Sequence, residues 1–302
     1  MMHSAVHRSH RALASRTGSL AAVLLVLGLV GCVTAPPRVQ APPRPPRVGI
    51  ALGGGGARGF AHVGVLRVLE QEKIPVDLVV GTSVGSLIGA LYADSGRVLD
   101  LEMLAFQVNK DDLFDYRALA LLSGGLVKGD RLERFVTEHV KARAIEQLRI
   151  PFAAVAVELR TGRTMVFESG SVARAVHASA AIPGVFVPVE IDGLTFVDGG
   201  VAAPVPAAIA RQKGADVVIA VAIPAAVPKN TPRTPVGMVM HAVNIMAAEI
   251  GRLHANEADV VIEPQVGDVG YDDFSQIRRL IEAGEMAARS ALPRIHAALS
   301  RS

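Results

Sequence analysis

From Arg47 onward, short runs of apolar residues alternate with longer stretches in which apolar residues recur at helical spacing. Several of the short runs are continuously apolar and lack the alternation of a strand that has one face in water. Such runs are typical of strands covered on both faces, as in a largely parallel sheet. The pattern therefore predicts an α/β fold of three layers (α/β/α) with a largely parallel central sheet.

The element boundaries follow from the same two patterns. Strands are predicted at residues 47–52, 76–81, 151–159, 164–168, 194–198, 216–223 and 259–263. Helices are predicted at residues 57–72, 84–94, 98–108, 130–142, 171–180, 204–213, 236–254 and 275–299. In the last helix we expect Ser275 as the N-cap and a kink at Pro293. Its buried stripe should consist of Ile277, Leu280, Ile281, Gly284, Ala288, Ala291, Leu292 and Ile295.

Composition and charge exclude several classes of protein. Half of the 302 residues are hydrophobic and a fifth are charged, which excludes a long disordered chain. The first 47 residues hold six of the 31 Lys and Arg and none of the 28 Asp and Glu, so the remainder is slightly acidic. The chain also lacks Trp, and we expect no nucleic-acid partner. No repeat or second linker is visible, which predicts one domain over residues 47–302.

The N-terminus has the pattern of a secretory signal. Residues 1–17 are polar and basic, and residues 18–31 are apolar but too few to span a bilayer well. Leu29-Val30-Gly31-Cys32 resembles the lipobox of bacterial lipoproteins, which implies cleavage of residues 1–31 and acylation of Cys32. The alternative is an uncleaved anchor followed by a small buried cysteine.

The residues after Cys32 suggest where such a lipoprotein would lie. Residues 32–46 are rich in proline and predict an extended tether, or a disordered spacer without a partner. Val33, rather than Asp, follows Cys32. By the resemblance, we expect a membrane anchor in the outer membrane, with the protein facing the periplasm.

The first of three glycine-marked turns follows the first predicted strand. Gly53-Gly54-Gly55-Gly56-Ala57-Arg58-Gly59 opens a helix, and amides at a helix start favour an anion, either a phosphate or the oxyanion of acyl transfer. The turn also fits the dinucleotide pattern G-x-G-x-x-G. That interpretation requires an acid at the end of the second strand, where Gly81-Thr82-Ser83 stands instead, so we do not favour it.

The second turn, Gly81-Thr82-Ser83-Val84-Gly85, joins a strand to a helix and has the pattern of a nucleophile elbow. In such an elbow, small flanking residues leave the serine hydroxyl exposed at the bend. Gly81, Gly85 and Gly89 recur every four residues and would let the helix pack closely on a neighbour. The alternative is that the glycines serve packing alone and Ser83 only caps the helix.

An activated serine needs a base. His62 and the downstream histidines lie in helical patterns, where we expect structural roles: His139, His177, His241, His254 and His296. The third turn, Asp198-Gly199-Gly200, instead places a carboxylate at the end of a strand. By itself it would be interpreted as an ordinary Asp-Gly turn.

Together, the three turns resemble the patatin-like phospholipase family, and closely its bacterial branch. The resemblance extends through GGGGARGFAHVGVLRVLE, VVGTSVGSLIGALYA, ASAAIPGVFVPV and FVDGG. It implies Ser83 as nucleophile, Asp198 as base, and an oxyanion hole formed by the amides around Gly54, Gly55, Gly56 and Arg58. It also implies hydrolysis of phospholipid or lysophospholipid acyl esters without metal or cofactor. A carboxylate is a weak base at its ordinary pKa, so we expect Asp198 to be partly buried.

Two further expectations concern the segment from Asp111 to Gly129. We interpret it as a packed connector, with a lipid-entry cap as the alternative, and we interpret Asp111, Asp112 and Asp115 as solvated charges rather than a metal site. Two other functions stay open: an esterase or thioesterase acting on other acyl substrates, and a lipid-binding scaffold without activity.

Overall fold

A computed structural model describes residues 44–115, 127–224 and 233–301. From Pro45 onward these residues belong to one compact unit. The predicted signal peptide, Cys32 and nearly all of the tether lie outside the described residues.

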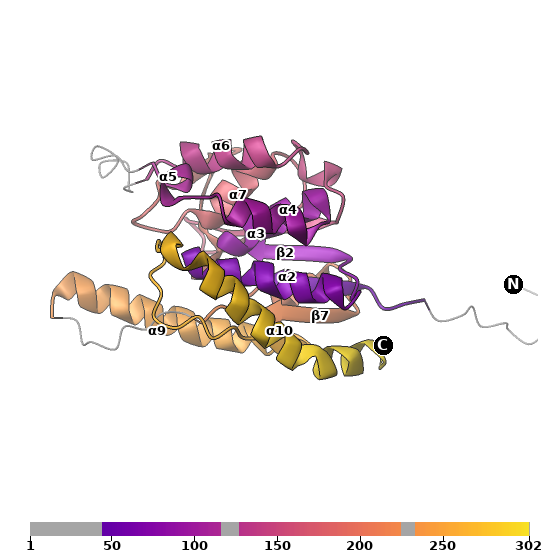
Figure 1. Cartoon of the computed structure of the whole chain (residues 1–302). Coiled ribbons are helices and arrows are strands. Elements are labelled where there is room, and N and C mark those ends of the chain that lie inside the picture. Colours follow the sequence, from indigo (N-terminus) through magenta and orange to yellow (C-terminus); the bar gives the residue numbers. More distant parts are fainter. Residues whose placement is uncertain (1–43, 116–126, 225–232, 302) are drawn as a thin grey trace, which may run out of the picture. The chain divides into compact units, whose positions relative to one another are not determined.

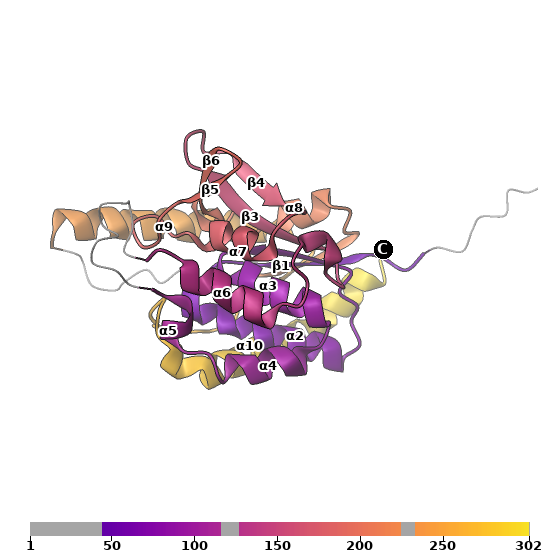
Figure 2. The ribbon, with the colours of Figure 1, turned by 90° about the horizontal axis from the view of Figure 1, so that it is seen from above.

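The described chain is built around one eight-stranded sheet, shown in Figures 1 and 2. The strand order is β5-β6-β3-β2-β1-β7-β8, and β4 pairs with β3 beside this series. Strands β3, β2, β1, β7 and β8 are parallel, whereas β4, β5 and β6 run antiparallel at one side. The strands span Val48–Leu52 (β1), Leu78–Thr82 (β2), Phe152–Glu158 (β3), Thr164–Phe167 (β4), Val189–Ile191 (β5), Leu194–Asp198 (β6), Val217–Val221 (β7) and Val260–Ile262 (β8).

Helices cover both faces of this sheet, so the predicted three-layer α/β fold with a mostly parallel sheet is confirmed. Figure 2 shows α8 and α9 on one side and α2, α3, α4, α6 and α10 on the other. The helices span Ala61–Gln71 (α2), Val84–Ser95 (α3), Val98–Ala105 (α4), Lys110–Leu113 (α5), Asp130–His139 (α6), Val172–Ala180 (α7), Ala207–Gln212 (α8), Pro235–Ala255 (α9) and Ile277–Leu299 (α10).

The two faces of the sheet pack differently because successive side chains of a strand point to opposite sides. In β1, Ile50 and Leu52 are buried in the larger core beneath α2, α3 and α10. Ala51 points to the other side, into a smaller core that is rich in alanine and valine. Every residue of β1, β2, β3 and β7 is buried, which explains why these strands have continuously apolar sequences.

Helix α10 confirms the predicted stripe and corrects its expected start. Apart from the half-buried Leu292, all the predicted stripe residues are buried. Ser275 is not the N-cap: it lies in a short 3-10 turn, where Asp273 accepts its amide, and α10 begins after Gln276. The Asp273 side chain thus caps the 3-10 turn that precedes α10, and Ser275 lies inside that turn. The helix continues through Pro293.

Candidate active site

The three glycine-marked turns meet at one edge of the sheet because of the strand register. Thr82, the last residue of β2, pairs with Val155 of β3, and Asp198, the last residue of β6, pairs with Ala156. Ser83 and Asp198 therefore flank β3 at nearly the same level. Neighbouring strands are about 4.8 Å apart, so two short side chains can meet across the intervening strand.

Ser83 lies at a strained bend between β2 and α3. Its φ of 56° and ψ of −127° fall in a region that non-glycine residues seldom adopt. A methyl group on Gly81 or Gly85 would overlap backbone atoms, those of Gly85 and Leu52 respectively. The close packing expected of these glycines is thus confirmed, and it lets α3 start directly against the ends of β1 and β2.

A residue that sequence reasoning missed supports this bend. Ser179 of α7 is fully buried, and its hydroxyl accepts the Ser83 amide at 2.9 Å. The same hydroxyl donates to the Val155 carbonyl at 2.6 Å. Ser179 therefore fixes the Ser83 backbone to β3. Its only sign in the sequence is its place in the block ASAAIPGVFVPV, which indicates a similarity but no role.

The side chains of Ser83 and Asp198 are in direct contact. Ser83 Oγ donates to Asp198 Oδ2 at 2.6 Å, and Oδ1 of the same carboxylate accepts the Gly200 amide at 2.6 Å. Both side chains are nearly buried, with 6% of Ser83 and 5% of Asp198 exposed. Burial raises the pKa of Asp198 from 3.8 to about 6, although the hydrogen bonds from Ser83 and Gly200 act in the opposite direction. The carboxylate is thus ionised at neutral pH and a stronger base than a solvated aspartate.

The described histidines take no part in this pair. His62 is fully buried and its Nε2 contacts the Gly53 carbonyl at 2.8 Å, so it braces the glycine-rich turn. Burial lowers the pKa of His62 to about 4, which keeps the ring neutral in ordinary buffers. His177 contacts Glu133, and His139 contacts the Phe135 carbonyl of its own helix. These structural contacts agree with the roles expected of helical histidines.

The glycine-rich turn passes directly beside Ser83. A methyl group on Gly54 would meet Ser83 Cβ at 3.4 Å, so this glycine lets the backbone approach the hydroxyl. The Gly54 amide, however, already donates to the Pro204 carbonyl at 2.9 Å. This corrects the prediction that it contributes to an oxyanion hole. Within the described chain, the amides of Gly55 and Gly56 have no such partner, and they remain the candidate donors.

Arg58 shapes this turn through its side chain. The guanidinium is buried and donates to the Gly55 carbonyl at 3.1 Å and to the Pro224 carbonyl at 2.8 Å. Burial lowers its pKa. Because Arg58 holds the Gly55 carbonyl on one side, the peptide groups of the turn are fixed relative to Ser83. The side chain thus clamps the turn to the chain that follows β7.

One of the three aspartates that follow α4 differs from expectation. Asp115 is buried and accepts the Gly129 amide at 2.7 Å, and Asp112 accepts the Asn109 amide at 2.8 Å in a capping box. Because Asp115 is buried, the interpretation as a solvated charge is wrong for it, whereas Asp111 and Asp112 are exposed, as expected. Most of the 111–129 segment, at residues 116–126, lies outside the described residues, and the choice between connector and cap stays open.

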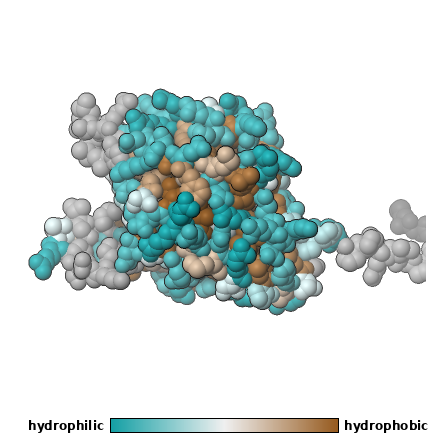
Figure 3. All heavy atoms as spheres, viewed as in Figure 1, coloured by the Kyte–Doolittle hydropathy of each residue, from teal (hydrophilic) through white to brown (hydrophobic). Residues whose placement is uncertain are grey.

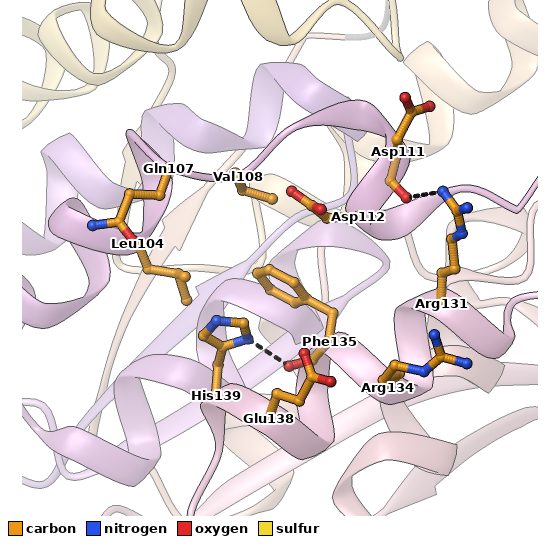
Figure 4. Close-up of a pocket in the computed structure, with 10 residues that line it drawn as sticks. All are labelled: Leu104, Gln107, Val108, Asp111, Asp112, Arg131, Arg134, Phe135, Glu138 and His139. Atoms are coloured by element: carbon orange, nitrogen blue, oxygen red, sulfur yellow. Dashed lines mark hydrogen bonds between the residues drawn. The ribbon is translucent and has the colours of Figure 1, made fainter.

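A cavity of about 550 Å³ lies apart from Ser83, between α4, α5 and α6 (Figure 4). Several of its polar groups are engaged within the protein: Arg131 donates to the Asp111 carbonyl, and His139 contacts the Phe135 carbonyl. None of the predicted site residues lines it. We therefore assign no role in the reaction to this cavity.

Comparison with known proteins places the chain in a family. Residues 50–211 match the family model of patatin-like phospholipases. An uncharacterized NTE family protein of Mycobacterium tuberculosis is 36% identical over 178 residues, which cover 59% of this chain and 49% of that protein. Human patatin-like phospholipase domain-containing protein 6 is 36% identical over 179 residues, covering 58% of this chain but 13% of that protein. The chain thus corresponds to about half or less of these relatives.

Among solved structures, VipD from Legionella pneumophila has the same fold. The TM-score is 0.53 at 14% identity, and the match covers 83% of this chain and 67% of that one. The family match spans the glycine-rich turn, the elbow at Ser83 and the turn at Asp198, which are also the three segments that meet at the sheet edge. The chain belongs to the patatin-like phospholipase family.

Proposed function

We propose that this chain is a serine acyl hydrolase of the phospholipase or lysophospholipase type, which cleaves carboxylic esters of lipids. The observation that carries the proposal is the 2.6 Å hydrogen bond from Ser83 Oγ to a buried Asp198 carboxylate. Membership of a family described as phospholipases supports the substrate class.

In the proposed reaction, Asp198 Oδ2 accepts the Ser83 proton while Oγ attacks the ester carbonyl carbon. The carbonyl oxygen becomes an oxyanion, which the amides of Gly55 and Gly56 stabilise; one such donor typically contributes about 3–4 kcal/mol. The intermediate collapses, the C–O bond breaks and the alcohol leaves with the proton from Asp198. Water then attacks the acyl-enzyme, Asp198 accepts its proton, and the fatty acid leaves as Ser83 regains its hydrogen.

Labelling with a fluorophosphonate probe tests the nucleophile. We expect the wild type to be labelled and Ser83→Ala not to be. Ser95→Ala is the matched control, because Ser95 lies at the other end of the same helix, away from Ser83, and should keep full labelling. Equal labelling of the wild type and Ser83→Ala would remove the catalytic proposal and leave a lipid-binding scaffold.

A substrate panel tests the class of ester. We expect Ser83-dependent release of fatty acid from phospholipid or lysophospholipid, together with cleavage of a short nitrophenyl ester. Activity confined to the short ester or to an acyl thioester would contradict a phospholipase and indicate the alternative esterase or thioesterase.

We further propose that Cys32 carries a lipid anchor and that the protein lies in the cell envelope, on the periplasmic side of the outer membrane. The support is the basic and apolar pattern of residues 1–31 and the Leu-Val-Gly-Cys sequence that ends at Cys32. We expect Cys32→Ser to abolish incorporation of labelled palmitate. Undiminished labelling of that variant would contradict the anchor.

A further inference from the structure

Helix α9 carries apolar side chains on its solvent-facing side. Met238, Ile245, Met246 and Leu253 are each about half exposed, at 49–56%. Their spacings of seven, one and seven residues place them on one side of the helix. The other side approaches the domain, where Ala255 is buried and Gly251 lies against Pro204. Exposed apolar side chains gathered in this way indicate an interaction surface.

The first half of α9 projects beyond the domain at the end where α5 lies, as Figures 1 and 2 both show. This end holds the candidate active site. Lys110 of α5 pairs with Asp272, and the neighbouring Tyr271 carbonyl accepts the Ala57 amide of the glycine-rich turn. The segment that leads from β7 towards α9 also starts beside the glycine-rich turn, because the Pro224 carbonyl accepts a hydrogen bond from the Arg58 side chain.

The charges around α9 suit an anionic surface. The sequence has no acidic residue between Asp216 and Glu249, whereas Arg233 is exposed just before the helix. Glu249 pairs with Arg252, and this exposed ion pair lies between Met246 and Leu253, so the uninterrupted apolar side is that of Met238, Ile245 and Met246. In the middle of the face shown in Figure 3, apolar patches are interspersed with hydrophilic residues. On α4 and α10, for example, the exposed Met103 and Met286 lie near the ion pairs that Arg67 forms with Glu102 and Glu285.

We propose that α9 docks on a phospholipid surface: Met238, Ile245 and Met246 enter the acyl region, and the active site is held at the membrane interface. Apolar insertion combined with the attraction of basic residues to anionic headgroups is the usual basis of interfacial binding. None of the helices in the described part of the chain combines the length and apolar character needed to traverse a bilayer. The docking proposal rests on the proposed function only for its link to a lipid ester substrate.

A single tryptophan tests the insertion directly, because the chain contains none. We would place Met246→Trp in the full chain with Cys32→Ser and Ser83→Ala, so that no acyl anchor forms and the vesicles stay intact. With vesicles of two parts phosphatidylcholine to one part phosphatidylglycerol, we expect a blue shift of its emission and quenching by brominated acyl chains. Met286→Trp is the matched control, because Met286 on α10 is at least as exposed as Met246, and it should show neither change.

Two outcomes would overturn the docking. One is an unchanged Met246→Trp spectrum on vesicles that bind the protein. The other is a blue shift that grows with protein concentration without vesicles, which would assign the face to a second copy of the chain.

Activity separates this proposal from the proposed function. In the Cys32→Ser chain with Ser83 intact, we expect Ile245→Glu with Met246→Glu to lower vesicle phospholipid hydrolysis about tenfold or more. Hydrolysis of a short soluble ester should not change, and Met286→Glu should leave both activities unchanged. Docking would be contradicted if the α9 variant lost both activities equally, or if it lost neither. A wild type that is inactive on every ester would contradict the proposed function alone.

Discussion

The carboxylate of Asp198 combines two conflicting requirements, because a group buried enough to be a useful base is also costly to ionise. Its raised pKa of about 6 predicts the acid side of the pH–rate profile. We expect kcat/KM on a short soluble ester to fall tenfold per pH unit below about pH 6, since protonated Asp198 cannot accept the Ser83 proton. His62 titrates near 4 and cannot produce this limb. A rate that stays constant down to about pH 4 would contradict Asp198 as the base.

The same pKa has a consequence for stability. The folded state binds this proton more tightly than the unfolded state, so the group's stabilising contribution is full below about pH 3.8 and lost as the pH rises through about 6. Asp198→Asn removes the buried charge and keeps the shape. We expect this variant to be inactive and, at pH 8, more stable than the wild type by about 1–3 kcal/mol in urea unfolding.

The stability difference should vanish as the pH falls below about 4, where the wild-type carboxyl is neutral as well. An Asp198→Asn variant that is less stable than the wild type at both pH values would show that burial is not what raises this pKa.

Ser179 gives a prediction about positioning rather than chemistry. Ser179→Ala leaves the Ser83 amide and the Val155 carbonyl without their shared partner. We expect kcat to fall about 10- to 100-fold with little change in KM for a short ester, because the bend no longer holds Ser83 in line with Asp198. The acid limb near pH 6 should be kept, and Ser179→Thr should recover part of the rate. A change confined to KM or to thermal stability would contradict this role.

At the scale of elements, close approach of α3 to β1 depends on Gly85. An added methyl group there would overlap the Leu52 carbonyl, which is backbone and cannot move aside. We expect Gly85→Ala to lower the free energy of unfolding by about 1–3 kcal/mol. Gly251→Ala is the matched control within a helix, because its added methyl group would lie 3.7 Å from Pro204, an ordinary contact.

Gly251→Ala should stabilise the protein by about 0.5–1 kcal/mol, since alanine favours a helix over glycine. Urea unfolding of the two variants measures both effects. Changes of the same sign would show that packing against β1 is not what requires glycine at position 85.

The sequence predicted those elements in which buried apolar residues recur at regular intervals or form a continuous run. Long buried strands such as β3 give continuous apolar runs, and the stripe of α10 repeats at helical spacing. Strand β5 was missed because the exposed Glu190 interrupts its apolar residues, whereas the equally short β8 is continuously apolar and was predicted. Helix α5 was missed because its four residues are too few to show a helical period.

Only part of the candidate site could likewise be predicted from the sequence. Ser83 and Asp198 could be predicted because each lies in a short motif with its own glycines. The engagement of the Gly54 amide could not, because its partner Pro204 is distant in sequence and joins it only through folding. Ser179 and the buried Asp115 depend on long-range contacts of the same kind. Local patterns therefore indicated the proposed reacting groups but not the residues that hold them.

At the scale of the whole molecule, the point where the chain enters the domain bears on how an anchored form would work. Arg47 precedes β1 and binds Asp216 and the Lys213 carbonyl near the start of β7, whereas Ser83 lies beyond the other ends of these strands. A protein held at Cys32 would thus be attached at the end remote from Ser83, the proposed nucleophile. Under the proposed anchoring, the domain would therefore have to turn about its attachment point for Ser83 to meet lipids of the leaflet that carries it.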